Sequence, residues 1–563
     1  MSQTMNVHYS VKDGVLTLGN DLFCKSFEGV ESVTAAERDE NGLSLPFTEL
    51  TAVGDGRTRR YCVWPDLAVV YMPDYDEKNL MTLAGDHWIV RNVKLNAFTD
   101  EYDTLTEEST VHMFQHNVRN RKGEIFILEN PEDGNAMVII SETPDHQTAT
   151  LNILKGVLTV ENGKNALALG FCKMGEGEAL CRAYYRHARN CRGLVTMSNT
   201  WGDRNGFSRV CRDFVLREIE AGHDIGVDIV QIDDGWQTGS TADLTRRDAR
   251  GRRVFEGDFW DLSLDRFPNG MREMTEVAQK HGIKVGMWFA PDSQSNFARL
   301  ERDKAVLRKA YEEWGIRFFK LDMFFIESNE DRDHFLELLR EIYSFGNDVA
   351  VQLDVTRNVR MNYLCGRQYG TVFVENRYHR SANSFPHRIL RNLWMISRYI
   401  PSSKFQFELI NPDLYPECYA ENDPFAPIGY DMGYLFATVM LSNPLFWMEM
   451  QFLSDKRRAE LKPVMEIWKQ HRENLATADV QPIGECPSGR SISGFCIKKD
   501  GKPTYLLLFR ENTERASLVI PAPVNGEQAE ILISNGDTKV NVMNGAVEVT
   551  FAKERSFAFV QLS

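Results

Sequence analysis

The pattern of apolar and polar residues changes twice along the chain and divides it into three parts. Residues 1–190 carry short stretches in which apolar and polar positions alternate, separated by turn signals such as Asp13-Gly14. Alternation with a period of two is typical of strands that bury one face, and many such strands predict a β-sandwich. Residues 481–563 return to this pattern, which predicts a smaller antiparallel β-sandwich at the C-terminal end.

The middle part, residues 191–480, alternates continuous apolar runs with amphipathic helical segments. This alternation is typical of βαβ units and a parallel sheet. Eight strands within about 250 residues match a (β/α)8 TIM barrel, so we predict a central barrel between the two β domains. The predicted strands are residues 194–201, 228–234, 283–290, 316–322, 349–354, 370–375, 404–409 and 435–443. The predicted helices are residues 205–221, 271–281, 295–314, 332–345 and 386–399.

Length, charge and cysteine usage narrow the class of protein. The chain has 563 residues, 43% of them hydrophobic, which is too long for one ordinary domain. Its net charge of −15 disfavours nucleic acid and anionic membranes as partners. We find no secretory signal at the N-terminus and no run of about 18 apolar residues that would predict a membrane span. The ten cysteines include no Cys-x-x-Cys pair, so we expect reduced thiols in a cytoplasmic protein.

Charged and aromatic side chains follow most of the predicted barrel strands at their C-terminal ends, where barrel enzymes hold their active sites. An isolated Asp after a strand is more often a helix cap, but the repetition of the pattern favours a site. The side chains at this rim are Trp201, Asp233, Asp234, Trp236, Trp288, Lys320, Asp322, Asp354, Glu375 and Arg377. Aromatic rings beside carboxylates suit a pyranose, because a ring stacks on its apolar face and the acids accept its hydroxyl hydrogens.

Hydrolysis of a glycoside needs one ionised and one protonated carboxyl group. Asp322 is the candidate nucleophile, because Lys320 lies two residues away on the same strand face and favours the ionised form. Glu375 is the first candidate for the acid, since the apolar run before it raises a carboxyl pKa, and Asp354 is the second.

The other rim residues are expected to bind substrate. Asp233 and Asp234 are adjacent and point to opposite faces of a strand, so only one reaches a given hydroxyl unless the backbone turns at Gly235. The expected substrate-binding residues are Trp201, Asp233, Asp234, Trp236, Trp288, Lys320, Asp354 and Arg377.

No cofactor or metal is expected, because no His, Cys or Asp cluster has metal-ligand spacing and there is neither a Gly-x-Gly-x-x-Gly motif nor a P-loop. The expected partner is an oligosaccharide or glycoside substrate. The sequence does not indicate an oligomeric state and leaves a homo-oligomer open.

Four motifs within residues 195–325 resemble those of glycoside hydrolase family 36, a family of α-galactosidases, and more distantly those of family 27. The motifs are Gln231-Ile232-Asp233-Asp234-Gly235-Trp236, Arg266-Phe267-Pro268-Asn269-Gly270, Gly286-Met287-Trp288-Phe289-Ala290-Pro291 and Phe319-Lys320-Leu321-Asp322. The three-part layout is also similar to that of the family. The resemblance implies an exo-acting, retaining α-galactosidase in which Asp322 is the nucleophile. It also implies that Asp233, Asp234, Trp288 and Lys320 bind the sugar.

The second half of the barrel departs from the family pattern. Where the family carries an Asp acid in a Trp-x-Ser-Asp-like context, this chain has Phe373-Val374-Glu375-Asn376-Arg377.

Several alternatives therefore stay open. In the first alternative, the substrate is another α-glycoside, such as an N-acetylgalactosaminide, an arabinopyranoside or an acidic sugar. Arg357, Arg360 and Arg377 would suit the acidic sugar. In the second, the enzyme is a transglycosylase, in which a sugar rather than water attacks the covalent glycosyl-enzyme intermediate. In the third, the barrel binds sugar but does not catalyse a reaction. The pair Phe446-Trp447 lines either the pocket or an interface.

Overall fold

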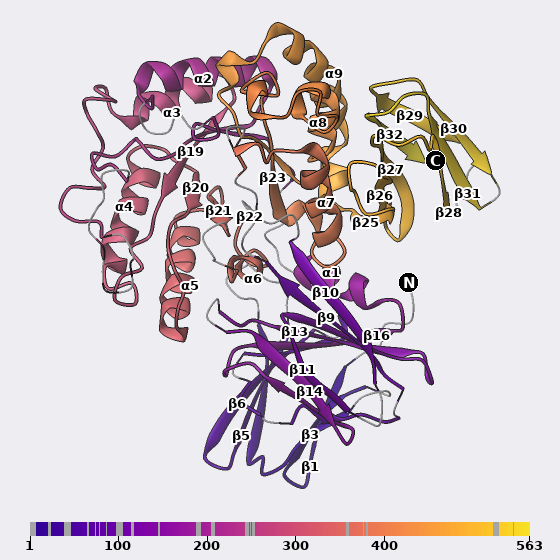
Figure 1. Ribbon diagram of the computed structural model, residues 1–563. Coiled ribbons are helices and arrows are strands. Elements are labelled where there is room, and N and C mark those ends of the chain that lie inside the picture. Colours follow the sequence, from indigo (N-terminus) through magenta and orange to yellow (C-terminus); the bar gives the residue numbers. More distant parts are fainter. Residues whose placement is uncertain are drawn as a thin grey trace.

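The computed structural model contains a closed barrel of eight strands, with β-sheet regions before and after it in the chain (Figure 1). This arrangement confirms the predicted fold class. The structure describes residues 7–562 apart from 21–23, 39–46, 65–66, 74, 78, 86, 97–104, 114–116, 145–146, 187–192, 204–208, 242–246, 248, 250, 252–253, 356–359, 375–376, 379–380, 522–527 and 544.

The N-terminal region is built on a nine-stranded antiparallel sheet. Its strands, in spatial order, are β10 (Thr106–His112), β9 (Ile89–Leu95), β12 (Ile125–Asn130), β13 (Asn135–Ser141), β16 (Leu167–Lys173), β7 (Val69–Met72), β6 (Arg57–Trp64), β5 (Phe47–Gly54) and β4 (Ser32–Arg38). A four-stranded sheet shares a core with it and consists of β11 (Asn117–Gly123), β14 (Ala149–Leu154), β15 (Val157–Glu161) and β8 (Met81–Thr82). A three-stranded sheet consists of β1 (His8–Lys12), β2 (Val15–Gly19) and β3 (Cys24–Phe27).

The nine-stranded sheet is covered on both faces. All seven residues of β13 are buried, because Met137 and Ile139 pack in the core shared with the four-stranded sheet, whereas Val138 and Ile140 pack on the barrel side. Helix α1 (Gly177–Arg186) belongs to that second core. A strand that is covered on both faces reads as a continuous apolar run, as residues 136–140 do.

The barrel strands run parallel, and β24 pairs with β17 to close the ring through Met197 and Leu445. The strands are β17 (Met197–Asn199), β18 (Ile229–Ile232), β19 (Lys284–Phe289), β20 (Phe318–Leu321), β21 (Ala350–Asp354), β22 (Thr371–Phe373), β23 (Phe405–Leu409) and β24 (Asn443–Phe446). The helices of this part are α2 (Arg212–Ile225), α3 (Met271–Lys280), α4 (Leu300–Glu312), α5 (Asn329–Ser344), α6 (Asn362–Cys365), α7 (Pro386–Ile396), α8 (Met432–Ala437) and α9 (Asp455–Thr477).

Three sequence predictions in the barrel were wrong. The helix predicted over residues 205–221 begins only at Arg212, since residues 209–211 are not helical. The eighth strand is β24 and not residues 435–443, whose first residues belong to helix α8. Asp431 begins that helix, because its side chain accepts a hydrogen bond from the backbone N–H of Tyr434. Helix α4 begins at Leu300 instead of residue 295, because residues 295–297 have positive φ values that a helix does not accommodate.

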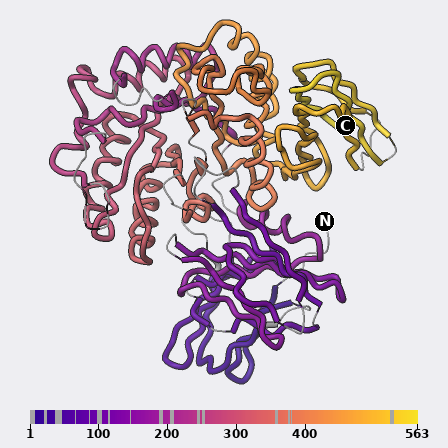
Figure 2. Tube along the Cα trace, viewed as in Figure 1, coloured from indigo at the N-terminus to yellow at the C-terminus, as the bar shows by residue number. Residues whose placement is uncertain are grey.

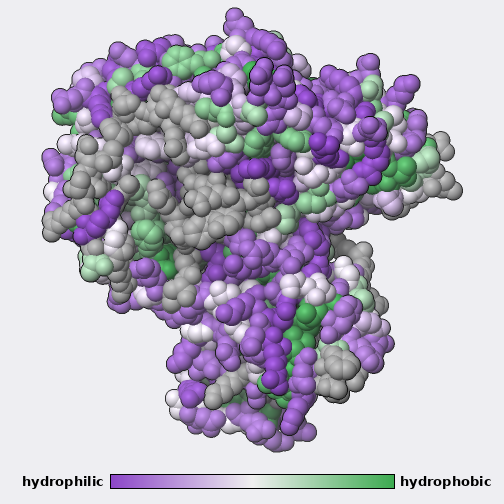
Figure 3. Space-filling model, in the orientation of Figure 1, coloured by the Kyte–Doolittle hydropathy of each residue, from purple (hydrophilic) through white to green (hydrophobic). Residues whose placement is uncertain are grey.

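The C-terminal region is a two-sheet sandwich. One sheet has five strands, β25 (Asp479–Gly484), β26 (Ile492–Lys499), β27 (Lys502–Arg510), β32 (Ser556–Leu562) and β29 (Ala529–Ser534), and the other has three, β28 (Ser517–Pro521), β31 (Ala546–Phe551) and β30 (Thr538–Met543). The two β regions lie on different sides of the barrel (Figure 2). Hydrophilic residues dominate the surface in the view of Figure 3, and the hydrophobic ones are scattered.

Candidate active site

The C-terminal ends of three barrel strands bring three carboxylates around one lysine. The ammonium of Lys320, on β20, lies 3.0 Å from Asp233 Oδ2, 3.7 Å from Asp322 Oδ2 and 3.8 Å from Asp354 Oδ2. These three acids follow or end β18, β20 and β21, so parallel strands deliver them to the same rim. We call Lys320, Asp233, Asp322 and Asp354 the Lys320 cluster.

The charge on Lys320 is fixed by these neighbours. Burial alone lowers the pKa of Lys320, but the three carboxylates outweigh that effect and hold it well above its usual value. The ammonium also lies 5.4 Å from the ring of Phe373 and 5.3 Å from that of Trp447, within the range of cation–π attraction. Trp447 therefore lies beside the Lys320 cluster, whereas Phe446 packs in the core against Phe436.

Asp233 is held from two sides. Asn199, at the end of β17, donates through Nδ2 to Asp233 Oδ2 at 2.8 Å, and Lys320 donates to the same oxygen. The backbone N–H of Asp233 donates to Thr200 Oγ1 at 3.0 Å. The sequence analysis missed Asn199, although its position at the end of the first barrel strand is the same signal that identified the acids.

The carboxylate of Asp234 is bonded to the loop that follows β18. The backbone turns at Gly235, where φ is 129°, which the sequence had left open, and Asp234 accepts hydrogen bonds from Gln237 Nε2 and Thr241 Oγ1. Its two carboxylate oxygens thus hold the loop that follows β18.

Asp322 is the most exposed acid of the Lys320 cluster, with 15% of its side chain accessible against 4% and 3% for Asp233 and Asp354. Trp288 Nε1 donates to Asp322 Oδ2 at 3.1 Å, and the backbone N–H of Met323 donates to Oδ1 at 2.6 Å. Both donors hold the carboxylate in one orientation.

The residue after Asp322 has an uncommon backbone conformation. Met323 has a φ of 58°, in the left-handed region that non-glycine residues seldom adopt. Such conformations persist where the surrounding structure enforces them, and they gather at functional sites. At this position the Met323 N–H donates to the Asp322 carboxylate.

The predicted aromatic residues separate into two groups. Trp201 Nε1 donates to the hydroxyl of Tyr378 at 3.0 Å, and Trp288 contacts Asp322, so both lie at the barrel rim. Trp236 is buried, as Trp288 is, but it is stacked on Trp260 with 5.8 Å between ring centroids, and its Nε1 donates to the Trp288 carbonyl. The structure places Trp236 behind Trp288 and not in the site.

The rim formed by the sixth strand is described only in part. Glu375, the first candidate for the acid, lies outside the described residues. Arg377 is fully buried, its backbone N–H donates to Glu408 Oε1 at 2.8 Å, and its Nη1 donates to the carbonyl of Asn383. Asp354, the second candidate, accepts a hydrogen bond at its main-chain oxygen from Asn362 Nδ2 at 2.6 Å.

Among the described residues, no group of three or more His, Cys, Asp or Glu side chains is arranged to hold a metal ion. In the same residues, every helix is too short or too polar to span a bilayer.

Sequence comparison gives limited information. No protein-family model matches the chain. The chain is 27% identical over 107 residues to α-galactosidase 2 of Pediococcus pentosaceus. The matched segment is 19% of this chain and only 13% of that protein.

Structural comparison covers nearly the whole chain. The galactosidase domain of the α-galactosidase–sucrose kinase AgaSK superimposes with a TM-score of 0.66 at 10% identity, over 95% of this chain and 86% of that one. A variant of the GH36 α-galactosidase AgaA from Geobacillus stearothermophilus, solved in complex with raffinose, gives 0.65 at 11% identity over 100% and 92%. The α-galactosidase from Lactobacillus brevis gives 0.63 at 9% identity over 100% and 97%. The chain therefore shares the fold of these α-galactosidases.

Proposed function

We propose that this protein is a retaining, exo-acting α-glycosidase that hydrolyses terminal α-galactosides. The observation that carries the proposal is the Lys320 cluster, in which one buried ammonium lies within 4 Å of three carboxylates at the barrel rim. The shared fold with α-galactosidases supports the choice of substrate.

In the proposed reaction, Asp322 is the nucleophile. Its carboxylate forms a bond to the anomeric carbon while the bond to the leaving oxygen breaks, and a carboxylic acid protonates that oxygen. Water, deprotonated by the same acid in its conjugate form, then attacks the anomeric carbon and releases Asp322 and the sugar with retained configuration. The donors on Asp322, Trp288 Nε1 and Met323 N–H, hold its carboxylate in one orientation before substrate arrives.

The charge of the Lys320 cluster favours a neutral sugar. Three carboxylates against one ammonium leave negative charge at the rim, which suits hydroxyl hydrogens and repels an acidic substrate. The arginines that suggested an acidic sugar do not alter this. Arg360 Nη1 lies 3.1 Å from Glu124 Oε1 of the N-terminal region, Arg377 is fully buried, and Arg357 lies outside the described residues.

The test of the nucleophile uses 4-nitrophenyl α-D-galactopyranoside. We expect wild type to hydrolyse it with retained configuration by NMR, and Asp322→Ala to lose about 10⁴-fold or more in kcat. Azide should restore turnover of Asp322→Ala and yield the β-galactosyl azide, because it attacks from the face that the carboxylate occupied. Asp265→Ala, which removes an exposed carboxylate from the same barrel, is the matched control. Inverted product from wild type would disprove the retaining mechanism.

The acid is assigned by comparing Glu375→Ala with Asp354→Ala. The variant that lacks the acid should keep the first step on an activated nitrophenyl substrate but lose it on an unactivated oligosaccharide, since only the latter needs a protonated leaving group. Azide should then attack the covalent intermediate and give the α-galactosyl azide. We expect this for Glu375→Ala, and the same result for Asp354→Ala would move the role there. A panel of nitrophenyl glycosides, including the N-acetylgalactosaminide and the arabinopyranoside, tests the choice of sugar.

A further inference from the structure

Asn199, at the end of the first barrel strand β17, uses both N–H groups and the oxygen of its amide in hydrogen bonds. Its Nδ2 donates to Gln231 Oε1 at 2.9 Å and to Asp233 Oδ2 at 2.8 Å. Its Oδ1 accepts from the backbone N–H of Trp201 at 2.8 Å. Asn199 is 1% exposed. An amide has two N–H donors, so neither is left for another partner, and the side chain is fixed beside the Lys320 cluster.

The orientation of the Asn199 amide follows from its partners. The backbone N–H of Trp201 can only donate, so it requires the amide oxygen. The ionised carboxylate of Asp233 can only accept, so it requires the amide nitrogen. The reverse orientation would bring oxygen against oxygen at Asp233 and nitrogen against N–H at Trp201. Asn199 is therefore a donor to Asp233.

Within the described residues, three donors approach the carboxylate of Asp233. Its Oδ2 accepts from Asn199 at 2.8 Å and from Lys320 at 3.0 Å, and its Oδ1 accepts from the backbone N–H of Asp234 at 2.9 Å. An ionised carboxylate has about four such positions, two on each oxygen. Both positions on Oδ2 are filled, so the open one is on Oδ1. Only 4% of the Asp233 side chain is accessible, in keeping with a single open position.

We propose that Asn199 is a positioning residue for sugar binding, which fills Oδ2 of Asp233 together with Lys320 and leaves Oδ1 to accept a hydroxyl hydrogen of the substrate. The inference rests on the proposed function, because it takes the Lys320 cluster as the sugar site. A carboxylate that three donors hold is in its binding orientation before the sugar arrives. Asn199 thus contributes to sugar binding without contacting the sugar.

Asn199→Asp tests this role, because the new side chain has nearly the same shape and lacks both donors. At neutral pH its carboxylate lies beside that of Asp233 and repels it. As the pH falls, two carboxylates at this distance share a proton, and the protonated group donates in place of Nδ2. The titratable groups that face it are Asp233 directly and, across Lys320, Asp322 and Asp354. Strand β24, on the other side of β17, carries no titratable residue.

The measurements are the dissociation constant of galactose by isothermal titration calorimetry, and KM and kcat for 4-nitrophenyl α-D-galactopyranoside. Both are made at about pH 5 and about pH 7.5, and each variant is compared with wild type at the same pH. We expect Asn199→Asp to weaken galactose binding and raise KM by about tenfold at the higher pH, and this loss to shrink at least about threefold at the lower pH. The value of kcat should change less than KM, since Asp322 keeps its donors Trp288 and Met323.

Asn443→Asp is the matched control. Asn443 is buried at the opposite end of the barrel, its Nδ2 also donates twice, to the carbonyls of Ser403 and Phe405, and its Oδ1 accepts from the backbone N–H of Val195. The change removes the same kinds of contact away from the Lys320 cluster, so its effect on galactose binding should be small and equal at the two pH values.

Asn199→Ala covers the case in which Asn199→Asp does not fold. It removes both donors without adding a charge, and it should weaken galactose binding about tenfold at both pH values. The thermal unfolding midpoint of each variant verifies that it is folded under the conditions of the binding measurement.

An equal loss in Asn199→Asp at the two pH values would overturn the proposal, because a purely structural role predicts it. So would wild-type galactose binding by Asn199→Ala, or a pH-dependent loss in Asn443→Asp. The proposed function fails in a different way, when wild type binds galactose but does not hydrolyse the nitrophenyl glycoside, and the binding data then still decide the role of Asn199. A wild type that neither binds galactose nor hydrolyses the glycoside would overturn both proposals.

Discussion

Two groups of three carboxylates, all buried except the partly exposed Asp322, lie near the rim of this barrel, and among the described residues only one group encloses a buried cation. Asp233, Asp322 and Asp354 surround Lys320. The second group, Asp203, Glu218 and Glu449, connects the loop after β17, helix α2 and the segment after β24. Its cationic partner among the described residues is Arg209, which lies 2.9 Å from Glu449 but is 48% exposed.

The difference is visible in the ionisation of the second group. Burial raises the pKa of Asp203 to about 7, and repulsion from Glu449 and Glu218 adds to this, against the backbone hydrogen bond that Glu449 donates. Burial likewise raises the pKa of Glu218 to about 7. The repulsion among clustered acids can be reduced by a cation between them or by protonation of some of them. The first group contains a cation, and the raised pKa values of the second favour protonation.

Removal of the Lys320 ammonium should leave the first group of carboxylates, like the second, without a buried cation. We expect this change to have the largest effect on stability. We expect Lys320→Met to lower the free energy of unfolding by about 3 to 5 kcal/mol at neutral pH, because it leaves the buried carboxylates of Asp233 and Asp354 without their partner. Under the proposed function, kcat should also fall, by about 10² to 10³-fold.

Urea unfolding and steady-state kinetics measure these effects. Lys304→Met is the matched control, since Lys304 also bridges two carboxylates, those of Glu301 and Glu337, but on the helix surface. We expect it to cost less than about 1 kcal/mol. Equal losses for the two variants would show that burial of Lys320 has no special energetic role.

The second group should make stability depend on pH. Asp203 and Glu218 titrate near 7 when folded and near 4 when unfolded, so the folded state binds more protons between these values. Stability is then greatest below about pH 4 for these groups and falls as pH rises towards 7, by about 1.4 kcal/mol per pH unit and group. Asp203→Asn should remove one group's share of this slope while its side-chain oxygen still accepts from the Glu449 N–H.

Urea unfolding of wild type and Asp203→Asn at pH 5, 6 and 7 tests this prediction. Asp265→Asn, an exposed acid of the barrel, is the control and should leave the slope unchanged. Parallel pH profiles for wild type and Asp203→Asn would contradict the raised pKa.

The smallest expected effect concerns the exposed cation of the second group. Arg209 lowers the pKa of Asp203, so Arg209→Gln should move the decline in stability to higher pH. Because Arg209 is about half exposed, the change in unfolding free energy should be below about 1 kcal/mol. The midpoint of the pH profile is the measurement, and a shift towards lower pH would contradict the assignment.

The first half of the barrel was predictable from the sequence. Residues 229–232 and 318–321 form strands because each is a continuous apolar run that ends in charged residues, which is a local signal. Once the strands are parallel neighbours in a barrel, their C-terminal ends meet, and this brings Lys320 within hydrogen-bond distance of Asp233 although 87 residues separate them.

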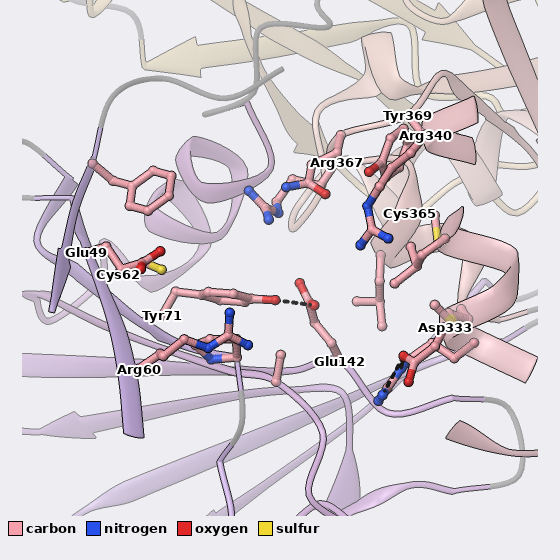
Figure 4. Close-up of a pocket in the computed structure, with 18 of the residues that line it drawn as sticks. Glu49, Arg60, Cys62, Tyr71, Glu142, Asp333, Arg340, Cys365, Arg367 and Tyr369 are labelled. Carbon is pink, nitrogen blue, oxygen red and sulfur yellow. Dashed lines mark hydrogen bonds and ion pairs between the residues drawn. The ribbon is translucent and has the colours of Figure 1, made fainter. Parts of the chain in front are cut away.

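Other features depend on contacts that no local pattern encodes. Trp236 belongs to the strongest motif, but its environment is decided by Trp260 and Trp314, which pack on it from distant segments. The apolar run at residues 435–443 fits a helix or a strand equally well, and the cap at Asp431 decides for a helix at its start. A cavity between the N-terminal sheet and helix α5 (Figure 4) is not visible in the sequence, because its walls come from two regions separated by more than a hundred residues.

The closure of the barrel between its first and last strands has a consequence for synthesis. Val195 donates a hydrogen bond to Asn443 across 248 residues, and β17 pairs with β24. During translation, the first seven barrel strands are therefore synthesised before the eighth, which closes the barrel. The strands of the N-terminal sheets are all synthesised much earlier. Until the eighth strand is synthesised, the incomplete barrel has two unpaired strand edges. Such edges can pair with other chains, so we expect chaperones to protect the nascent chain from aggregation most at this stage.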